Sequence, residues 1–117
     1  MAADAASSPF TLSVDTSRSP EHLVRLTGDL DLSTAPELRT HLLNALGTQQ
    51  LVAVDLDGLD FIDSTGVGVL VAALKHARAQ DRELALICSA ARVLRTFQIL
   101  GLTSVFPIYN KVDDLPG

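Results

Sequence analysis

Two short segments near the start of the chain alternate between apolar and polar residues. The first runs from Phe10 to Asp15 and the second from Val24 to Leu30, and in both every second residue is apolar or small. This period of two is typical of a strand that buries one face. The residues between them, Thr16 to Pro20, are typical of a turn. We therefore predict two strands that form an antiparallel hairpin. The residues predicted to face the core are Phe10, Leu12, Val14, Val24, Leu26, Gly28 and Leu30.

Later apolar segments show no such alternation. Leu51–Leu56 and Leu84–Cys88 are short and almost entirely apolar, as expected of central strands that are covered on both faces. A last apolar segment, Val105–Tyr109, contains Pro107, which cannot donate a hydrogen bond to a neighbouring strand. We therefore predict two central strands, and a final strand at a sheet edge or a bulge.

A first helix is predicted between Thr34 and Gly47. Thr34 could cap its N-terminus while the Glu37 side chain reaches back to it, and Pro36 falls in the first turn, where its missing N–H costs nothing. Gly47 is a suitable end for the helix. The apolar stripe expected to face the core is Leu38, Leu42 and Ala45 or Leu46.

Two more helices are predicted after the central strands. The residues from Asp57 to Ser64 are interpreted as a loop, after which a helix begins at Ser64 or Thr65 and runs to about Gln80. The third helix is predicted to begin after a Ser89 cap, to end at Gly101 and to bury Val93, Phe97 and Leu100.

The predicted order is two strands followed by helices and strands in alternation. Such an order is typical of a largely parallel sheet, because each helix connects two parallel strands. We predict a single α/β domain over residues 10–117, preceded by a flexible N-terminus at 1–9. It has a mixed, mostly parallel sheet of about five strands, an N-terminal antiparallel hairpin and three main helices. Functional residues in such folds lie beyond the carboxyl ends of strands, and the segment 57–64 is one such place.

Length and charge restrict the class of protein. The 117 residues fit one domain and carry a formal net charge of −5. An acidic domain lacks the basic surface that binds nucleic acid or an anionic membrane. The N-terminus does not resemble a signal peptide, and the longest apolar run, Val67–Leu74, is too short to span a membrane. We expect a soluble, cytoplasmic protein that acts on a protein partner, a small ligand or a substrate.

Residues that commonly bind metals do not occur at ligand spacing. Cys88 is the only cysteine, so no internal disulfide or thiolate cluster can form, and its apolar neighbours predict a buried thiol. His22, His41 and His76 share no ligand spacing and are expected on the solvated surface. The acidic residues match no calcium-binding loop. We therefore predict no metal site.

One alternative uses an aspartate. Asp55 or Asp57, at the end of a central strand, could accept a phosphoryl group as the aspartate of response-regulator receivers does. Those proteins also need an acidic pair after the first strand and a later Lys, whereas the first strand here ends in Asp15-Thr16-Ser17. A receiver-like or small-ligand-binding domain stays open as the less favoured interpretation.

The segment from Asp60 to Gly68 contains the most informative chemistry. It places two hydroxyls, those of Ser64 and Thr65, where the chain enters a helix. Free backbone N–H groups and the positive end of the helix dipole meet there, and both suit a phosphoryl group. Glycines in the first turn weaken the helix but leave room for a partner. Equally, an Asp or Ser at this place could be a simple N-cap, so both interpretations remain.

Three enzyme motifs are absent from this segment. A nucleophile elbow needs Gly two residues before the serine, where Ile62 stands. A phosphate-binding P-loop needs Gly-Lys before Ser or Thr, and the chain contains no Gly-Lys. A dinucleotide fingerprint fails because Leu70 and Val71 follow Gly66-Val67-Gly68 where a third glycine belongs.

Two stretches resemble the STAS-domain family, in particular its anti-sigma factor antagonists. Residues 28–35, Gly-Asp-Leu-Asp-Leu-Ser-Thr-Ala, are similar to the acidic exit from the second strand of the family into its first helix. Residues 55–70 are similar to its central strand, phosphorylation loop and second helix. With the element order, the likeness extends from Phe10 to Asp114. The chain ends soon after this, so the last helix of the family is expected to be short or absent.

The resemblance implies a regulatory protein without catalytic activity. Ser64 would be the phospho-acceptor, flanked by Asp63 and Thr65, with Gly66 permitting the approach of a kinase and Asp31 as a nearby acidic residue. Together with Gly68 these residues form the predicted partner-binding site. The family's partner is an anti-sigma factor serine kinase that also binds a sigma factor. The unphosphorylated antagonist takes that kinase from the sigma factor, and a PP2C-type phosphatase restores the antagonist. ATP belongs to the kinase, so no cofactor is expected.

Other STAS proteins leave a second interpretation open. STAS domains also act without switching, as stress-complex scaffolds or as components of lipid-transport machinery. A serine within an intact Asp-Ser-Thr-Gly sequence, as at Ser64, favours the switch over an unphosphorylated subunit of a larger complex. Phosphorylation at Ser64 would distinguish the two.

Overall fold

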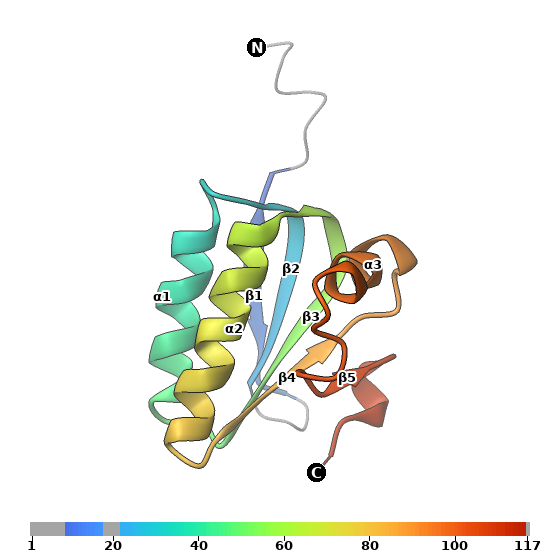
Figure 1. Ribbon diagram of the computed structural model, residues 1–117. Coiled ribbons are helices and arrows are strands. Elements are labelled where there is room, and N and C mark those ends of the chain that lie inside the picture. The colour runs from blue at the N-terminus through green and yellow to red at the C-terminus, as the bar shows by residue number, and fades with distance from the viewer. Residues whose placement is uncertain (1–8, 18–21, 117) are drawn as a thin grey trace.

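The computed structural model describes residues 9–17 and 22–116, so most of the predicted N-terminal lead-in and of the predicted turn lies outside the described residues. The elements follow the predicted order (Figure 1). The strands are β1 (Thr11–Asp15), β2 (His22–Leu30), β3 (Leu51–Ile62), β4 (Glu83–Ile87) and β5 (Ile108–Tyr109). The helices are α1 (Ala35–Leu46), α2 (Ser64–Ala79) and α3 (Ala91–Ile99), followed by a short 3₁₀ helix at Val112–Asp114.

The five strands form one mixed sheet in the order β1-β2-β3-β4-β5. β1 and β2 are antiparallel, with Leu12 opposite Leu26, and every later pair is parallel. Parallel neighbours require long connections, and α1, α2 and α3 provide them. The predicted α/β fold with an N-terminal hairpin is therefore confirmed. The prediction that Val14 faces the core is wrong, because Val14 lies near the end of the edge strand β1 and is 41% exposed. The prediction of an edge position for the last strand is also confirmed, although β5 has two residues instead of five.

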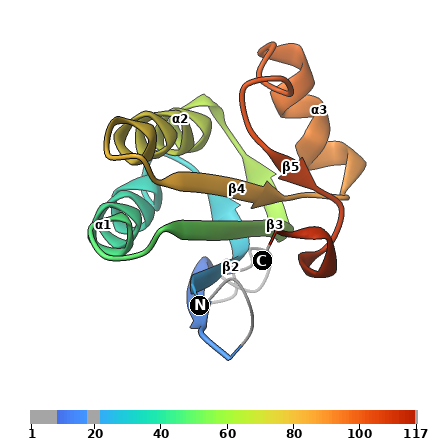
Figure 2. The same cartoon turned by 90° about the horizontal axis from the view of Figure 1, so that it is seen from below.

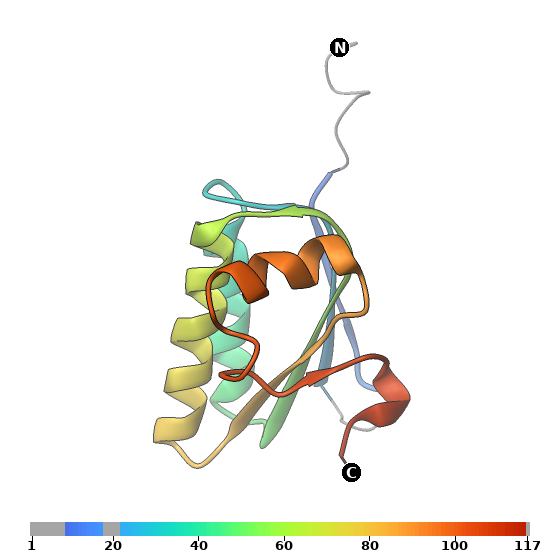
Figure 3. The same cartoon turned by 45° about the vertical axis from the view of Figure 1, so that its right-hand side comes forward.

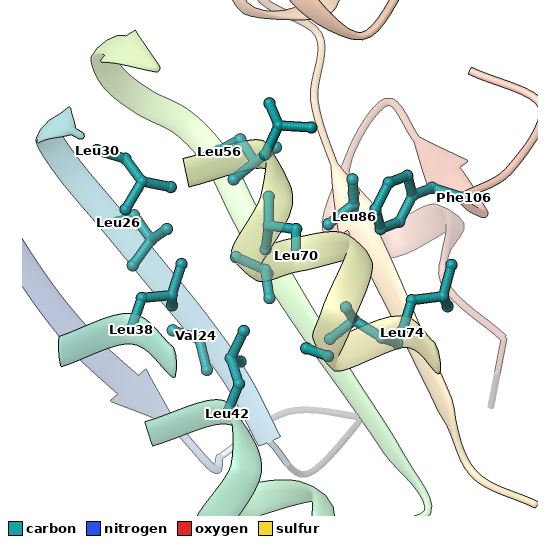
Figure 4. Close-up of a cluster of buried hydrophobic side chains, with 14 of the residues drawn as sticks. Val24, Leu26, Leu30, Leu38, Leu42, Leu56, Leu70, Leu74, Leu86 and Phe106 are labelled. Carbon is teal, nitrogen blue, oxygen red and sulfur yellow. The ribbon is translucent and has the colours of Figure 1, made fainter. Parts of the chain in front are cut away.

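The main core lies between the sheet and the paired helices α1 and α2, which run side by side along one face (Figures 1 and 2). Leucines from both helices meet leucines of β2, β3 and β4 (Figure 4). Burial of one such side chain stabilises the fold by about 1.5–3 kcal/mol. The fully buried leucines and valines of this core include Val24, Leu26, Leu30, Leu38, Leu42, Leu56, Leu70 and Leu86.

A smaller apolar cluster lies on the opposite face of the sheet. Leu23, Ala53 and Ile87 are buried there and pack against Val112 and Leu115. The C-terminal 3₁₀ helix thus covers the side of the sheet that faces away from α1 and α2 (Figure 3). Within the described residues the chain forms this single turn in place of a longer final helix, in line with the sequence-based expectation.

The predicted loop at 57–64 is wrong, because β3 continues to Ile62 and only Asp63 separates it from α2. The register of β3 against β2 shifts twice, between the partners of Arg25 and Thr27 and between those of Gly28 and Asp29. Each shift breaks the alternation of inward and outward residues. A strand with such irregularities does not show the period of two in its sequence.

Two smaller predictions about the third helix and its flanks also need correction. Ala90, not Ser89, is the N-cap of α3, and the Ser89 hydroxyl donates instead to the carboxylate of Asp57 at 3.0 Å. Val93 and Phe97 are buried as predicted, but Leu100 is exposed. Gly101 follows the helix with a φ of +70°, a conformation that glycine adopts easily.

Candidate functional site

The chain enters α1 and α2 at the same end of the sheet (Figure 1). This follows from the parallel pairing of β2 and β3, whose last residues, Leu30 and Ile62, lie opposite each other. The backbone N–H of Asp63 donates to the carbonyl oxygen of Leu30 at 3.2 Å and joins the two segments. The structure thereby places the segment that follows Leu30 beside the segment that contains Ser64.

Asp63 is the N-cap of α2. Its backbone is extended, and its carboxylate accepts a hydrogen bond from the N–H of Gly66 at 2.9 Å. Its carbonyl oxygen accepts from the N–H of Val67 at 3.0 Å. The bond to Gly66 satisfies a donor of the first turn that has no partner within the helix, and the bond from Val67 is the first backbone hydrogen bond of the helix itself. Asp63 is therefore the cap, and Ser64 is released from that role.

Ser64 is the first residue of α2, and both Ser64 and Thr65 are exposed. Within the described part of the chain, neither hydroxyl forms a hydrogen bond. The helix dipole directs its positive end toward this turn. A phosphoryl group on Ser64 would thus lie at the start of a helix of 16 residues, in a place that tolerates negative charge.

The two glycines of α2 differ in their surroundings. Gly66 is buried, and a Cβ atom there would lie 2.7 Å from Cγ of Leu30 and 3.0 Å from its carbonyl oxygen. Gly66 therefore lets the first turn of α2 pack against β2 within this chain. Gly68 is exposed, and a Cβ atom there would meet nothing within 4 Å. Of the two, Gly68 is the one that leaves open space outside the domain.

Asp31 organises the loop before α1. Its carboxylate accepts hydrogen bonds from the backbone N–H of Ser33 at 3.0 Å, from the Ser33 hydroxyl at 2.8 Å and from the N–H of Thr34 at 3.3 Å. The Ser33 hydroxyl is the main cause that lowers the pKa of Asp31 below its usual value. Asp31 therefore carries its negative charge at neutral pH and fixes the shape of the loop.

The capping box predicted at Thr34 and Glu37 is wrong. Thr34 precedes α1, but its side chain makes no capping hydrogen bond. Its hydroxyl donates to the carbonyl oxygen of Asp29 at 2.8 Å and accepts from the N–H of Asp31 at 2.9 Å. The Thr34 hydroxyl forms its hydrogen bonds with the residues that precede it, because the loop before α1 folds over the end of β2.

Two apolar side chains at this end were missed by the sequence analysis. Leu32, at the tip of the loop before α1, is 74% exposed, and Phe61, at the end of β3, is 50% exposed. Leu32 stands between Asp31 and Ser33, where a polar residue is usual for a loop. That mismatch is the only signal in the sequence that pointed to an exposed apolar side chain.

Comparison with known proteins identifies the family of this chain. Residues 13–115 match the model of the STAS domain. The chain belongs to the STAS-domain family. It is 31% identical over 102 residues to the anti-sigma-B factor antagonist of Listeria monocytogenes, a match that covers 86% of this chain and 90% of the relative. The resemblance to anti-sigma factor antagonists is thereby confirmed.

Solved structures agree with this STAS fold. An anti-sigma factor antagonist from Mycobacterium paratuberculosis superposes with a TM-score of 0.82 at 23% identity, over 92% of this chain and 93% of that one. The Bacillus cell fate determinant SpoIIAA in its phosphorylated form superposes with a TM-score of 0.66 at 21% identity, over 90% and 95%. At these identities the likeness concerns the fold.

Asp55 and Asp57, the possible phospho-acceptors of the receiver-like interpretation, both accept hydrogen bonds within this STAS domain. The Asp57 carboxylate accepts hydrogen bonds from the backbone N–H groups of Ser89 and Ala90, at 2.7 and 3.0 Å, and from the Ser89 hydroxyl. It thus anchors the connection between β4 and α3. Asp55 accepts from the N–H of Asp57 at 3.0 Å. Neither arrangement favours a phospho-acceptor aspartate.

Cys88 is buried, as predicted, at the end of β4. Burial is the main cause that raises the pKa of its thiol to about 11, and the negative charge of Asp57 adds to the effect. The thiol is therefore protonated at physiological pH and unreactive.

The prediction that all three histidines are separate, solvated residues is wrong. His22 and His41 are half-buried, and their Nε2 atoms lie 3.0 Å apart. Burial is the main cause that lowers the pKa of His22, and the charge of His41 lowers it further. The pair lies near the start of β2, at the opposite end of that strand from Ser64. His76 forms a hydrogen bond with Gln80.

The described residues contain neither a metal-binding cluster nor a membrane-spanning helix. Among them, no group of three or more His, Cys, Asp or Glu side chains is placed to hold a metal ion. No helix in the described part of the chain has both the length and the apolar character needed to cross a membrane.

Proposed function

We propose that this STAS domain is an anti-sigma factor antagonist switched by phosphorylation of Ser64. In its unphosphorylated form it binds an anti-sigma factor serine kinase and so frees the sigma factor. The observation that carries the proposal is the exposed Ser64 hydroxyl at the first residue of α2, next to the capping carboxylate of Asp63. The names of the relatives support it, since the Listeria protein is an anti-sigma-B factor antagonist and SpoIIAA has a phosphorylated form.

The physical effect of phosphorylation fits a change in binding without a change in fold. A phosphoryl group adds about −1.5 to −2 charges, close to Asp63 and to the loop of Asp31. The start of α2 stabilises this charge locally, so the domain keeps its shape. A partner packed on Ser64 meets the added charge directly. A coupling free energy of about 1–3 kcal/mol would change the affinity some 5–150-fold.

The other components belong to the partners. The kinase binds ATP and transfers the phosphoryl group to Ser64, and a PP2C-type phosphatase removes it. The chain itself supplies the acceptor hydroxyl and the binding surface, and it performs no catalysis. The cytoplasm is the compartment in which such an exchange with a sigma factor takes place.

Binding and phosphorylation can be tested with five versions of the chain: wild type, Ser64→Ala, Ser64→Asp, Thr65→Ala and Thr65→Asp. Each is offered to host extract, and the retained kinase is identified by mass spectrometry and then purified. We expect wild type, Ser64→Ala and Thr65→Ala to bind the kinase and Ser64→Asp to lose it, whereas Thr65→Asp, which adds the same charge one residue further along the helix, should weaken binding less than Ser64→Asp. Incubation with the kinase and ATP should phosphorylate every version that keeps Ser64.

The Thr65 variants are the matched controls, because Thr65 is exposed in the same turn. If Ser64→Asp binds the kinase as wild type does, the switch is refuted, and a non-switching STAS subunit of a larger complex becomes the better account. Phosphorylation at Thr65 alone, or on an aspartate, would also overturn the assignment of Ser64.

A further inference from the structure

Two of the six large apolar side chains that remain exposed in the described chain lie at the end of the sheet where the chain enters α1 and α2. Leu32 and Phe61 lie on the two segments that enter α1 and α2, and the hydrogen bond from Asp63 N–H to the Leu30 carbonyl oxygen joins these segments. Ser64 follows directly on one of them. The exposed large apolar residues of the described chain are Val14, Leu32, Phe61, Ile99, Leu100 and Val105.

Leu32 is held outward by the loop that carries it. The residues on either side, Asp31 and Ser33, are bonded to each other through the Asp31 carboxylate, and Thr34 is bonded to Asp29 and Asp31. These polar groups satisfy one another within the loop, which leaves the Leu32 side chain directed to solvent at 74% exposure. Because these bonds already order the backbone of the loop, a partner that covers Leu32 does not have to order that loop as well.

Phe61 is exposed because of the irregular register of β3. The second shift places Phe61 opposite Asp29 and Ile62 opposite Leu30, so that Ile62 is buried and Phe61 is half-exposed. The Phe61 ring also lines a shallow hollow of about 220 Å³ between β3 and α3, together with Val93 and Thr96. Phe is among the residues enriched at protein interfaces.

Arg92 lines the hollow beside Phe61, but the charged residues of the two joined segments themselves are all negative. Asp29, Asp31, Asp60 and Asp63 all belong to the two joined segments, and the whole chain has a formal net charge of −5. A complementary partner surface is therefore basic, with Arg or Lys side chains around apolar recesses. Apolar centres within a polar rim are the usual anatomy of a protein interface.

We propose that Leu32 and Phe61 are the two apolar anchors by which this domain binds its anti-sigma factor, on a basic surface of that protein with two apolar recesses. The inference rests on the proposed function and specifies its contact surface. It also accounts for the sensitivity of binding to Ser64. Ser64 lies three residues after Phe61 on the same segment, so a partner held by these anchors covers it, and a phosphoryl group buried there without new partners is costly.

The test is a calorimetric titration of the purified anti-sigma factor kinase, with ADP bound, into Leu32→Ala, Phe61→Ala, Phe61→Leu and Ile99→Ala. Ile99 is the matched control, since it is 76% exposed but lies at the end of α3. We expect Leu32→Ala and Phe61→Ala to weaken binding about 10–100-fold, Phe61→Leu to weaken it less, and Ile99→Ala to bind as wild type. Thermal unfolding of each variant shows whether the fold is retained.

Ser64→Asp is titrated in the same series so that the two proposals are tested separately. If Leu32→Ala and Phe61→Ala bind as wild type while Ser64→Asp does not, the anchors are refuted and the switch stands. If the anchor variants lose binding while Ser64→Asp keeps it, the switch is refuted and the anchors stand. Equal weakening by Ile99→Ala refutes the anchors, because the effect is then not local. Loss of self-association in the anchor variants, with kinase binding unchanged, identifies a second copy of this chain as the occupant and refutes the inference.

Discussion

The carboxylate of Asp63 accepts a hydrogen bond from the backbone N–H of Gly66 at 2.9 Å and so closes the first turn of α2, which contains Ser64. One residue thereby sets both the start of the helix and the position of the hydroxyl that follows it. This relationship leads to the first prediction, which concerns stability.

Asp63→Ala removes the cap of α2. We expect the free energy of unfolding to fall by about 0.5–2 kcal/mol, as for other lost N-caps. Asp63→Asn should retain most of the stability, because Asn caps nearly as well as Asp. Urea unfolding followed by circular dichroism measures both variants. Asp60→Ala is a control, since Asp60 is exposed and lies in the preceding strand; an equal loss there would contradict the capping role.

The two glycines of α2 are expected to respond in opposite ways to alanine. Gly66→Ala places a Cβ atom against Leu30, and such overpacking usually costs about 1–3 kcal/mol. Gly68→Ala meets no atom of this chain, and the gain in helix propensity should stabilise the domain by up to about 1 kcal/mol. Thermal unfolding distinguishes the two.

Gly68→Ala is also a probe of the partner. Because the added methyl group has no neighbour within 4 Å in this chain, weaker kinase binding by a more stable variant would locate the partner over Gly68. Unchanged affinity would remove Gly68 from the predicted partner-binding residues and leave the stability prediction intact.

Cys88 is expected to resist thiol reagents in the folded protein. Because the pKa of the Cys88 thiol is about 11, only about one thiol in a thousand is ionised at pH 8. Burial also blocks access to the sulfur. Ellman's reagent should therefore react slowly with the native chain and rapidly in urea. Fast reaction of the native protein would show that the end of β4 opens readily.

Stability should decrease on mild acidification because of His22. Its pKa is lowered in the folded state from 6.5, so the unfolded chain binds the proton more readily. The contribution of His22 is fully present above pH 6.5 and is lost as the pH falls through the lower pKa of the folded state. Urea unfolding between pH 8 and pH 5 should show this loss in wild type and a smaller loss in His22→Gln. His76→Gln should behave as wild type.

The order of the elements could be predicted because apolar periodicity reports burial directly. Val24, Leu26 and Leu30 are inward residues of β2, as their alternation indicated. Ser64 could be singled out because a hydroxyl at a helix start is visible in local sequence. In contrast, β3 beyond Leu56 was taken for a loop. The register of β3 shifts near Gly58, where a Cβ atom would lie 2.5 Å from the carbonyl oxygen of Leu26. These shifts depend on the neighbouring strand β2, so the sequence of β3 alone does not reveal them.

The missed features arise from contacts between segments that are distant in sequence. His22 and His41 are 19 residues apart and meet only because α1 packs near the start of β2. The exposure of Leu32 and Phe61 likewise depends on the Asp31 loop and on the pairing of β3 with β2. Apart from the apolar residue between Asp31 and Ser33, no local pattern in the sequence encodes these arrangements.

The described chain starts and ends at opposite ends of the sheet. Pro9 lies against Gly28, close to the end of β2 that leads toward Asp63. Pro116 lies beside Leu51 and Glu83, where β3 and β4 begin. β3 alone spans on the order of 35 Å between those ends. A dye or sensor surface coupled close to Pro9 therefore lies at the end of the sheet that carries Ser64, whereas one coupled close to Pro116 leaves that end free for a partner.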